Sequence, residues 1–157
     1  MNEAKITADL VTYLTPLNRG EITKLSDQST IGIPDMAVVG GHTTMWVEVK
    51  YEKYLKPHPF NLRKLLGWPG PQFRFVAKSD YHGSGSFYII FFHQTRLRRW
   101  NTMIFTGVQA ANWCNADENI YLDRTSSFPI YEGKAFHILW EEIQKRRKTC
   151  INPMKTF

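Results

Sequence analysis

The stretch from Ile31 to Tyr51 constrains the fold more than any other part of this 157-residue chain. It contains two short apolar runs, residues 35–39 and 44–51, separated by Gly40-Gly41-His42. Apolar runs of this length on either side of a glycine turn are typical of a β-hairpin. We therefore predict two antiparallel strands joined by a tight turn in this part of the chain.

Three charged residues stand out in this hairpin. Asp35 enters the first strand directly after Pro34, and the second strand carries Glu48 and Lys50. Because strand side chains alternate between faces, Glu48 and Lys50 should share one face with Trp46. The residues expected on the other face are apolar: Met45, Val47 and Val49. Two acids and a lysine that converge at adjacent strand ends are costly in a hydrophobic core, whereas they suit a metal site.

The remaining segments predict helices and strands around the hairpin. Helical spacing of apolar residues marks the segments 2–14, 61–66, 71–82, 108–119 and 134–148. Strands are expected over 21–25, 87–92, 102–106 and 120–122. The continuous apolar run FYIIFF at 87–92 indicates a central strand covered on both faces. The order helix, strand, strand, strand, helix, strand predicts a single α/β domain with a small mixed central sheet flanked by helices.

Composition and charge narrow the class of protein. Aromatic residues make up 14% of the chain and apolar content is ordinary, which indicates a globular domain rather than a disordered segment. The formal net charge of +6 is consistent with a polyanionic partner such as nucleic acid. Cys114 and Cys150 lack the spacing of a zinc site, so we expect free thiols in a reducing compartment.

No stretch of the sequence predicts secretion or a membrane span. The first residues, MNEAKITADL, are acidic and amphipathic, unlike a signal peptide. The longest apolar run, Phe87–Phe92, is too short to cross a bilayer. We therefore expect a soluble protein of the cytoplasm with no membrane partner.

The charged residues of the hairpin suit the hydrolysis of a phosphodiester bond. That reaction needs charge neutralisation at the phosphate, an activated water and a stabilised leaving oxygen, all of which Mg²⁺ can supply. Mg²⁺ prefers hard oxygen ligands and few protein carboxylates. The candidate ligands are Asp35, Glu48 and the backbone carbonyl of Val49, with Mn²⁺ as a substitute ion. Lys50 is the candidate to orient or help deprotonate the water, or to hold a phosphate oxygen.

Pro34-Asp35, twelve further residues and then Glu48-Val49-Lys50 resemble the signature of the PD-(D/E)XK nuclease superfamily. Members carry this motif on a β-hairpin in a core of helix, three strands, helix and strand, which is the order predicted above. The resemblance implies that an acid from the first helix joins the site, and Glu3 is the candidate. The pattern is closest to the branches similar to Holliday junction resolvases and VRR-Nuc nucleases, in which a glutamine opens the second helix, as Gln72 does here.

The resemblance covers residues 1–95 of one nuclease domain, to which residues 96–157 would add strands and a C-terminal helix. The same branches often carry a small hydroxyl residue before the Pro-Asp pair, and the candidates are Ser26, Ser29 and Thr30. The chain departs from their pattern after the glutamine, because Phe75 lies where a tyrosine partner would be expected.

The resemblance implies a Mg²⁺-dependent endonuclease that hydrolyses DNA and leaves 5′-phosphate and 3′-hydroxyl ends. The small size favours structure-selective cutting of branched or junction DNA, or site-specific cutting by a dimer. A cut in both strands requires two copies of a one-site domain, so we expect a homodimer. Compact nucleases of this kind are typical of phages and mobile elements. The alternatives are an RNA-cleaving nuclease, a nucleic-acid-binding protein of the same fold without catalysis, and a partner-binding module.

Clusters of cations predict where nucleic acid would bind. Phosphate contacts need a spread of positive charge and carry no sequence information. The candidates follow either the hairpin or the central strand: Lys53, Lys56, Arg63, Lys64, Arg98 and Arg99. The alternative for each cluster is a solubilising surface.

Each site residue also has an ordinary structural interpretation. Asp35 would then be a turn residue, and Glu48 and Lys50 would form the solvated face of an antiparallel strand. Glu3 would be an acid at a helix N-terminus and Gln72 a surface polar residue.

Overall fold

Within residues 1–25, 32–83, 85–122 and 127–151, which the computed structural model describes, six strands form one mixed sheet. Their order is β1 (Ile22–Lys24), β2 (Met36–Gly40), β3 (Thr43–Tyr54), β5 (Ser86–Gln94), β6 (Arg99–Thr106) and β8 (Ile130–Glu132). The short strands β4 (Phe60–Asn61) and β7 (Asn119–Ile120) pair separately. The predicted single α/β domain with a mixed central sheet is confirmed.

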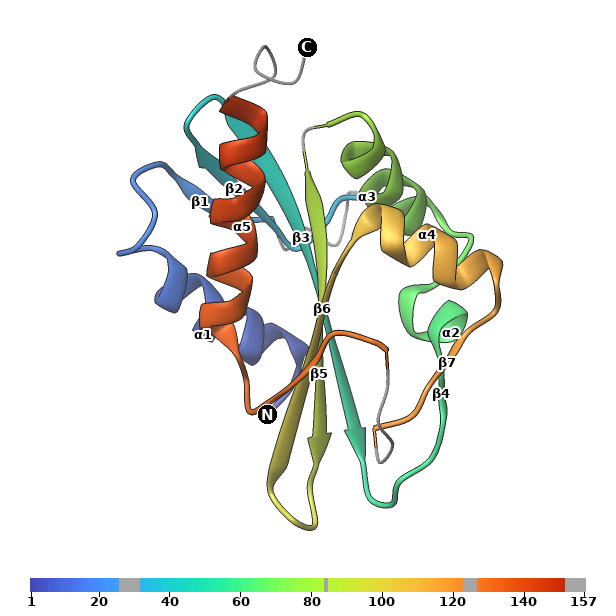
Figure 1. The fold of residues 1–157 in the computed structure, drawn as a ribbon. Coiled ribbons are helices and arrows are strands. Elements are labelled where there is room, and N and C mark those ends of the chain that lie inside the picture. Colours follow the sequence, from blue (N-terminus) through green and yellow to red (C-terminus); the bar gives the residue numbers. More distant parts are fainter. Residues whose placement is uncertain (26–31, 84, 123–126, 152–157) are drawn as a thin grey trace.

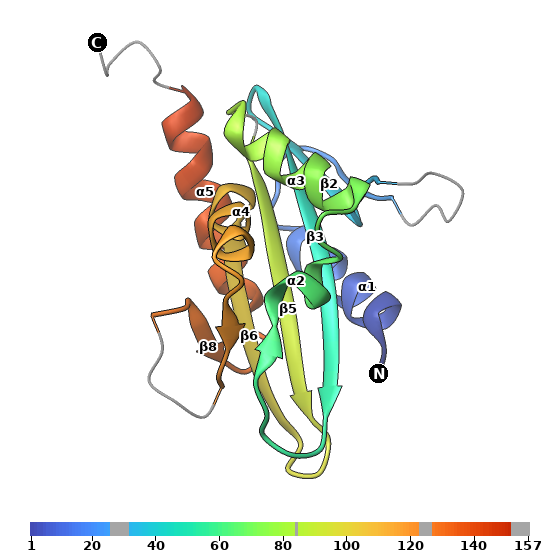
Figure 2. The ribbon, with the colours of Figure 1, turned by 90° about the vertical axis from the view of Figure 1, so that its right-hand side faces the viewer.

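Helices cover both faces of the sheet (Figure 1). One face carries α1 (Glu3–Leu14) and α5 (Phe136–Ile151), and the other carries α2 (Leu62–Leu66), α3 (Pro71–Tyr81) and α4 (Gly107–Asn115). Figure 2 views the second face, with these three helices in front of the strands. Each face therefore has its own hydrophobic core, and the sheet lies between the two.

Strand β5 is the centre of this arrangement. It pairs in parallel with β3 and antiparallel with β6, and residues 87–92 are all buried. A strand covered on both faces needs apolar side chains on both, which explains why FYIIFF shows no alternation. The prediction of a central strand covered on both faces is confirmed, and this strand lies beside the hairpin.

The hairpin of β2 and β3 forms as predicted, with Gly41 in the left-handed region at φ +63°. Glycine adopts this conformation without steric cost, which allows the tight turn. The apolar residues of β3 pack against α1 and α5: Met45, Val47 and Val49. On the opposite face Trp46 meets Phe75 of α3 edge to face, with ring centroids 5.1 Å apart. The predicted alternation of faces is thus confirmed.

Local caps explain where the helices begin and end. The side chain of Asn2 accepts a hydrogen bond from the backbone N–H of Lys5 at 2.9 Å and so caps the start of α1. Asn61 caps α2 in the same way. Pro71 occupies the first turn of α3, where its missing N–H costs nothing. These residues set the first turn of α1 and α3, which carry Glu3 and Gln72.

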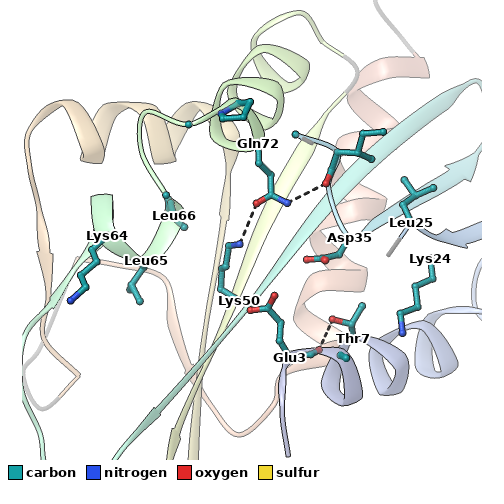
Figure 3. Close-up of a pocket in the computed structure, with 16 residues that line it drawn as sticks. Glu3, Thr7, Lys24, Leu25, Asp35, Lys50, Lys64, Leu65, Leu66 and Gln72 are labelled. Carbon is teal, nitrogen blue, oxygen red and sulfur yellow. Dashed lines mark hydrogen bonds between the residues drawn. The ribbon is translucent and has the colours of Figure 1, made fainter. Parts of the chain in front are cut away.

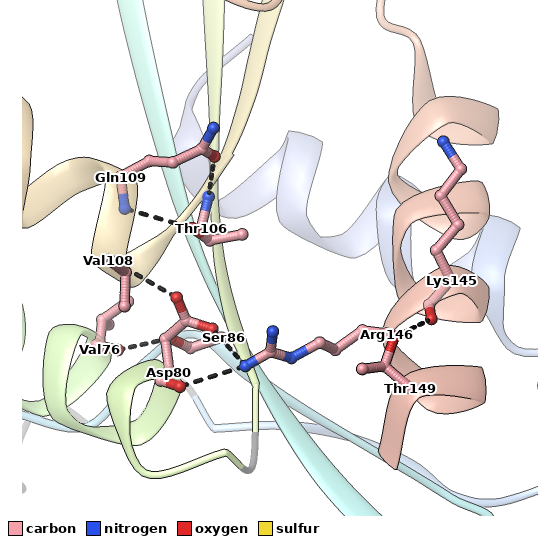
Figure 4. A network of polar contacts seen from close by, with 9 residues as sticks. All are labelled: Val76, Asp80, Ser86, Thr106, Val108, Gln109, Lys145, Arg146 and Thr149. Carbon is pink, nitrogen blue, oxygen red and sulfur yellow. Dashed lines mark hydrogen bonds and ion pairs between the residues drawn. The ribbon is translucent and has the colours of Figure 1, made fainter. Parts of the chain in front are cut away.

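Helices α3, α4 and α5 are joined by a buried polar contact, which we call the Asp80 clamp (Figure 4). Asp80 accepts hydrogen bonds from the backbone N–H of Val108 at 2.8 Å and from the guanidinium of Arg146 at 3.0 Å. Gly107 permits the close approach of α4 to α3, because a Cβ at this position would collide with the carbonyl of Val76. The clamp fixes the end of α3 that lies far from Gln72.

The structure also departs from the predicted elements. Strand β3 extends to Tyr54 rather than ending at Tyr51, because β5 pairs with it along its whole second half. The strands β4 and β8 were not predicted, since two or three residues give too short a pattern. Cys114 is a free, buried thiol, as expected. None of the helices within the described residues is long and apolar enough to cross a membrane.

Candidate active site

The candidate site lies where β2 begins and β3 continues past it. The last residue of β3 that pairs with β2 is Val47, opposite Met36. Beyond Val47, the edge of β3 that faces away from β5 has no β2 partner, so its backbone N–H groups need other acceptors. Glu48 and Lys50 therefore lie in the middle of β3 and not at its end, which corrects the prediction that the charged residues meet at adjacent strand ends.

Backbone N–H groups of the two neighbouring segments hold the carboxylates of Asp35 and Glu48. The Asp35 carboxylate accepts a hydrogen bond from the N–H of Val49 at 2.8 Å. In return, Oε2 of Glu48 accepts one from the N–H of Asp35 at 3.2 Å. This exchange continues the pairing of the two segments after the regular ladder has ended, and it fixes both carboxylates at one position.

Lys50 links the strand to helix α3 (Figure 3). Its Nζ lies 2.6 Å from Oε1 of Glu48 and donates to Oε1 of Gln72 at 3.3 Å. The amide of Gln72 in turn donates to the backbone carbonyl of Ile33 at 3.1 Å. Gln72 thus connects the lysine to the segment that precedes Asp35, and it is no isolated surface residue.

Glu3 reaches the same edge from helix α1. Its Oε2 accepts a hydrogen bond from the backbone N–H of Tyr51 at 3.3 Å. The N–H groups of Val49 and Tyr51, two residues apart, both point toward this edge and both meet a carboxylate. A strand residue directs its N–H and its C=O to the same side, so the carbonyl of Val49 also faces the carboxylates.

Burial distinguishes the site from an ordinary strand surface. Glu48 is 1% exposed, so the interpretation of Glu48 as part of a solvated face is wrong. Burial first, and then the negative charge of Asp35, raise the pKa of the Glu48 carboxyl to about 8 despite the attraction of Lys50. Burial also raises the pKa of Glu3, with a further contribution from Asp35. Three acids share a space in which one lysine does not balance them.

The pKa of Lys50 moves in the opposite sense to the effect of its burial. Burial alone would lower it, but the Glu48 carboxylate, its hydrogen bond and the charges of Glu3 and Asp35 raise it overall. Lys50 therefore stays protonated at neutral pH in this arrangement.

A cavity of about 830 Å³ opens over these residues. Glu3, Asp35, Lys50 and Gln72 line it, while Glu48 lies beneath its floor and pairs with Lys50. Apolar and glycine residues of the α2–α3 segment form much of the remaining wall. The cavity joins residues from α1, the β2–β3 hairpin and α3 that are far apart in the sequence.

The predicted nucleic-acid contacts are spread over the molecule. Lys64 lines the cavity. Arg63 instead packs at 4.1 Å over the ring of Trp68 and donates to the carbonyl of Cys114 at 2.7 Å, so its guanidinium already has partners within the fold. The remaining candidates are all exposed. Lys53 and Lys56 lie at or just beyond the C-terminal end of β3, and Arg98 and Arg99 lie where the chain turns from β5 into β6.

One charged lining residue is not among the residues predicted from the sequence. Lys24 of β1 faces the cavity from the side opposite Lys64 (Figure 3). The residues around Lys24 alternate only weakly and contain no motif. Lys24 comes to the site because β1 pairs with β2. The candidate hydroxyl residues Ser26, Ser29 and Thr30 lie outside the described residues.

The donor set suits a divalent cation of the Mg²⁺ type. Among the described residues, no group of three or more acidic, histidine or cysteine side chains lies close enough to hold one metal ion. A cation here would therefore have two carboxylates, from Asp35 and Glu48, with the Val49 carbonyl, water and substrate as further ligands. Mg²⁺ commonly binds in this way. Each hydrogen-bonded carboxylate oxygen retains a second lone pair, and a cation would relieve the repulsion that raises the pKa of Glu48.

Comparison with known proteins finds a similar solved structure and no family. No family model and no curated protein matches the chain. Among solved structures, the chain is similar to Hjc of Archaeoglobus fulgidus, a Holliday junction resolvase from an archaeal hyperthermophile. The two are 13% identical, the match covers 87% of this chain and 88% of that one, and the TM-score is 0.44. At this identity and TM-score the similarity carries no weight in assigning a function.

Proposed function

We propose that the protein is a metal-dependent endonuclease that hydrolyses phosphodiester bonds in DNA. One observation carries the proposal: Lys50 lies 2.6 Å from Glu48 and 3.3 Å from Gln72, beside Asp35 and Glu3, at an open cavity. A lysine and two acids that line a cavity, with a third acid buried beneath them, are poorly explained by packing. They are well explained by chemistry on a phosphate. The PD-(D/E)XK pattern of the sequence supports the same assignment.

Asp35 and Glu48 are the residues that would hold the cation, with the carbonyl of Val49. When bound, such an ion neutralises charge on the phosphate and lowers the pKa of a bound water. The two carboxylates are pre-positioned for this role, since a hydrogen bond of 2.8 Å from the N–H of Val49 holds Asp35 and one of 3.2 Å from the N–H of Asp35 holds Glu48. Glu3 adds an acceptor for a water proton at the same edge.

Lys50 would act on the water or on a phosphate oxygen. A protonated lysine has three N–H donors, and Glu48 and Gln72 take two of them. The third donor is available for a ligand in the cavity that Lys50 lines. Gln72 is a positioning residue in this scheme, because it orients the ammonium group through Oε1 and is itself oriented by the Ile33 carbonyl.

A homodimer that cuts branched or junction DNA is the form of the enzyme that we propose. One chain provides one site, so two cuts need two copies. Phage or mobile-element origin remains a prediction from the compactness of the chain.

The decisive experiment is a cleavage assay on end-labelled four-way junction, duplex DNA, single-stranded DNA and RNA. Cleavage is expected with Mg²⁺ or Mn²⁺ and none with EDTA. Asp35→Asn should abolish it. Asp9→Asn is the matched control, because Asp9 pairs with Lys5 at the surface of α1 and should leave cleavage unchanged. If the protein binds these substrates but cuts none of them with either ion, the enzyme assignment is wrong. A binding protein of this fold is then the remaining function.

A further inference from the structure

Two lysines stand on opposite sides of the carboxylates. Lys24 projects from β1 on one side of the cavity and Lys64 from α2 on the other, with Asp35 and Lys50 between them (Figure 3). Both residues are exposed. A strand of nucleic acid whose reacting phosphate lay at Lys50 would therefore pass a cation on each side.

Neither lysine side chain has a structural partner among the residues that the structure describes. Within the described part of the chain, Lys24 and Lys64 have no ion pair and no side-chain hydrogen bond, whereas Lys5 pairs with Asp9 and Lys145 with Glu142. Neither lysine is among the charges that shift the pKa of Glu48 or of Glu3. The charges that act on Glu48 are those of Asp35 and Lys50, and Glu52 joins them in acting on Glu3. Among the described residues, neither a structural role nor a charge-balancing role therefore explains the two lysines.

The described lining has little with which to read bases. Gln72, the residue type that pairs with adenine in direct readout, has its amide oxygen and nitrogen engaged by Lys50 and Ile33. The hydroxyl of Thr7 donates to the carbonyl of Glu3 at 2.7 Å. The rest of the described lining is largely aliphatic, proline or glycine: Ala4, Leu25, Gly32, Ile33, Leu65, Leu66, Gly67, Gly70 and Pro71. Such a surface can contact sugars and phosphates without distinguishing base pairs.

We infer that Lys24 and Lys64 bind the phosphates on opposite sides of the cleaved bond, so that the cavity takes one strand by its backbone and does not read its bases. The position of the cleaved bond rests on the proposed function. The two-sided phosphate contact itself does not, because it concerns binding alone. Lys24 is then a phosphate-binding residue on β1, a β-strand in which the sequence shows no motif.

The first test measures binding in EDTA, where no cleavage occurs, by fluorescence anisotropy of a labelled oligonucleotide over a series of salt concentrations. Lys24→Gln and Lys64→Gln should each weaken binding about three- to tenfold and lower the slope of log K against log salt by about 0.7–0.9. Lys78→Gln is the control, because Lys78 is exposed on α3 at the end away from Gln72. It should change neither quantity.

The second test locates each contact with oligonucleotides in which a single phosphate is replaced by a neutral methylphosphonate. Wild-type protein should lose affinity at two separate positions. The loss at one position should disappear in Lys24→Gln and the loss at the other in Lys64→Gln, because the cation that sensed the charge is gone. A pool with randomised bases around the site should bind as tightly as a single sequence.

The outcomes separate this inference from the proposed function. An unchanged salt slope in Lys24→Gln, or both lysines mapping to one phosphate, would overturn the two-sided contact even if the protein cuts DNA. Selection of particular bases from the pool would overturn backbone-only recognition. Conversely, if the two lysines map to two phosphates and no substrate is cut, the phosphate contact stands and the nuclease assignment fails.

Discussion

Two carboxylates are buried among the described residues, and their surroundings differ in charge balance. Asp80 is 4% exposed and Glu48 is 1% exposed. Each accepts one hydrogen bond from a backbone N–H and each faces one cation, Arg146 or Lys50. The immediate partners are therefore alike in kind, and the difference lies in what surrounds them.

At the Asp80 clamp the charges match. One carboxylate meets one guanidinium and the N–H of Val108 at the start of α4, with α3, α4 and α5 around them (Figure 4). At Glu48 the charges do not match, since Asp35 and Glu3 add negative charge beside a single lysine and the cavity opens above. A matched pair holds three helices together. An unmatched group with an opening suits a mobile cation and a phosphate.

The largest effect should separate these two acids in the cleavage assay. Glu48→Gln removes a charged cation ligand and should lower the cleavage rate about a thousandfold, because several kcal/mol of transition-state stabilisation depend on the ion. Asp80→Asn, assayed at a temperature where the protein remains folded, should change the rate less than about threefold. Equal losses in both variants would show that Glu48 is merely structural.

The next effect concerns pH and the stability of the metal-free protein. The pKa of Glu48 is about 8 when folded and 4.5 ordinarily, so between these values the folded protein binds more protons than the unfolded chain. The free energy of unfolding should therefore fall as pH rises across this window, by about 2–4 kcal/mol. Urea denaturation at several pH values measures this fall.

Variants show whether Glu48 is its source. Glu48→Gln cannot ionise and should lose most of the pH dependence, whereas Asp80→Asn should keep it. Added Mg²⁺ should restore the stability of the wild type near the top of the window, because it favours the ionised carboxylate. The same slope in Glu48→Gln as in wild type would contradict the assignment of the raised pKa to this residue.

A smaller loss of stability is expected at the Asp80 clamp. Val108 and Arg146 donate to different oxygens of Asp80, and an asparagine has only one side-chain oxygen, so one buried donor loses its partner. Asp80→Asn should lower the free energy of unfolding by about 1–3 kcal/mol at any pH near neutrality. Lys145→Gln on α5 is the control, since that lysine is exposed and pairs only with Glu142. A stability change no larger than that of the control would mean that the clamp contributes little.

The smallest effect should come from Gln72, which touches Lys50 and no carboxylate. Gln72→Ala should reduce cleavage roughly tenfold, as expected for a residue that positions a catalytic group. Binding of DNA in EDTA should stay within about twofold, and Gln72→Glu should shift the pH profile of cleavage by adding charge beside Lys50. A binding loss as large as the rate loss would make Gln72 a substrate contact instead.

Residues 35–50 illustrate which features could be predicted from the sequence. Alternation in β3 predicted that Trp46, Glu48 and Lys50 share one face, and Trp46 indeed meets Phe75 of α3 while Lys50 meets Gln72. The cleavage chemistry itself remains a prediction, because it depends on an ion and a substrate.

The sequence by itself determined the faces of the strands and the starts of the helices. Those properties depend on backbone geometry over a few residues, with a period of two in a strand and 3.6 in a helix, so they can be predicted without the rest of the chain. Tertiary structure alone decided that the pairing of β2 with β3 ends at Met36 and Val47. Beyond this pair, the edge of β3 is open to Asp35 and Glu3. Tertiary structure also decided that Lys24 faces the cavity and that Asp80 meets Arg146. These contacts join residues far apart in sequence, and they follow from strand order, register and helix packing, which many weak interactions set together.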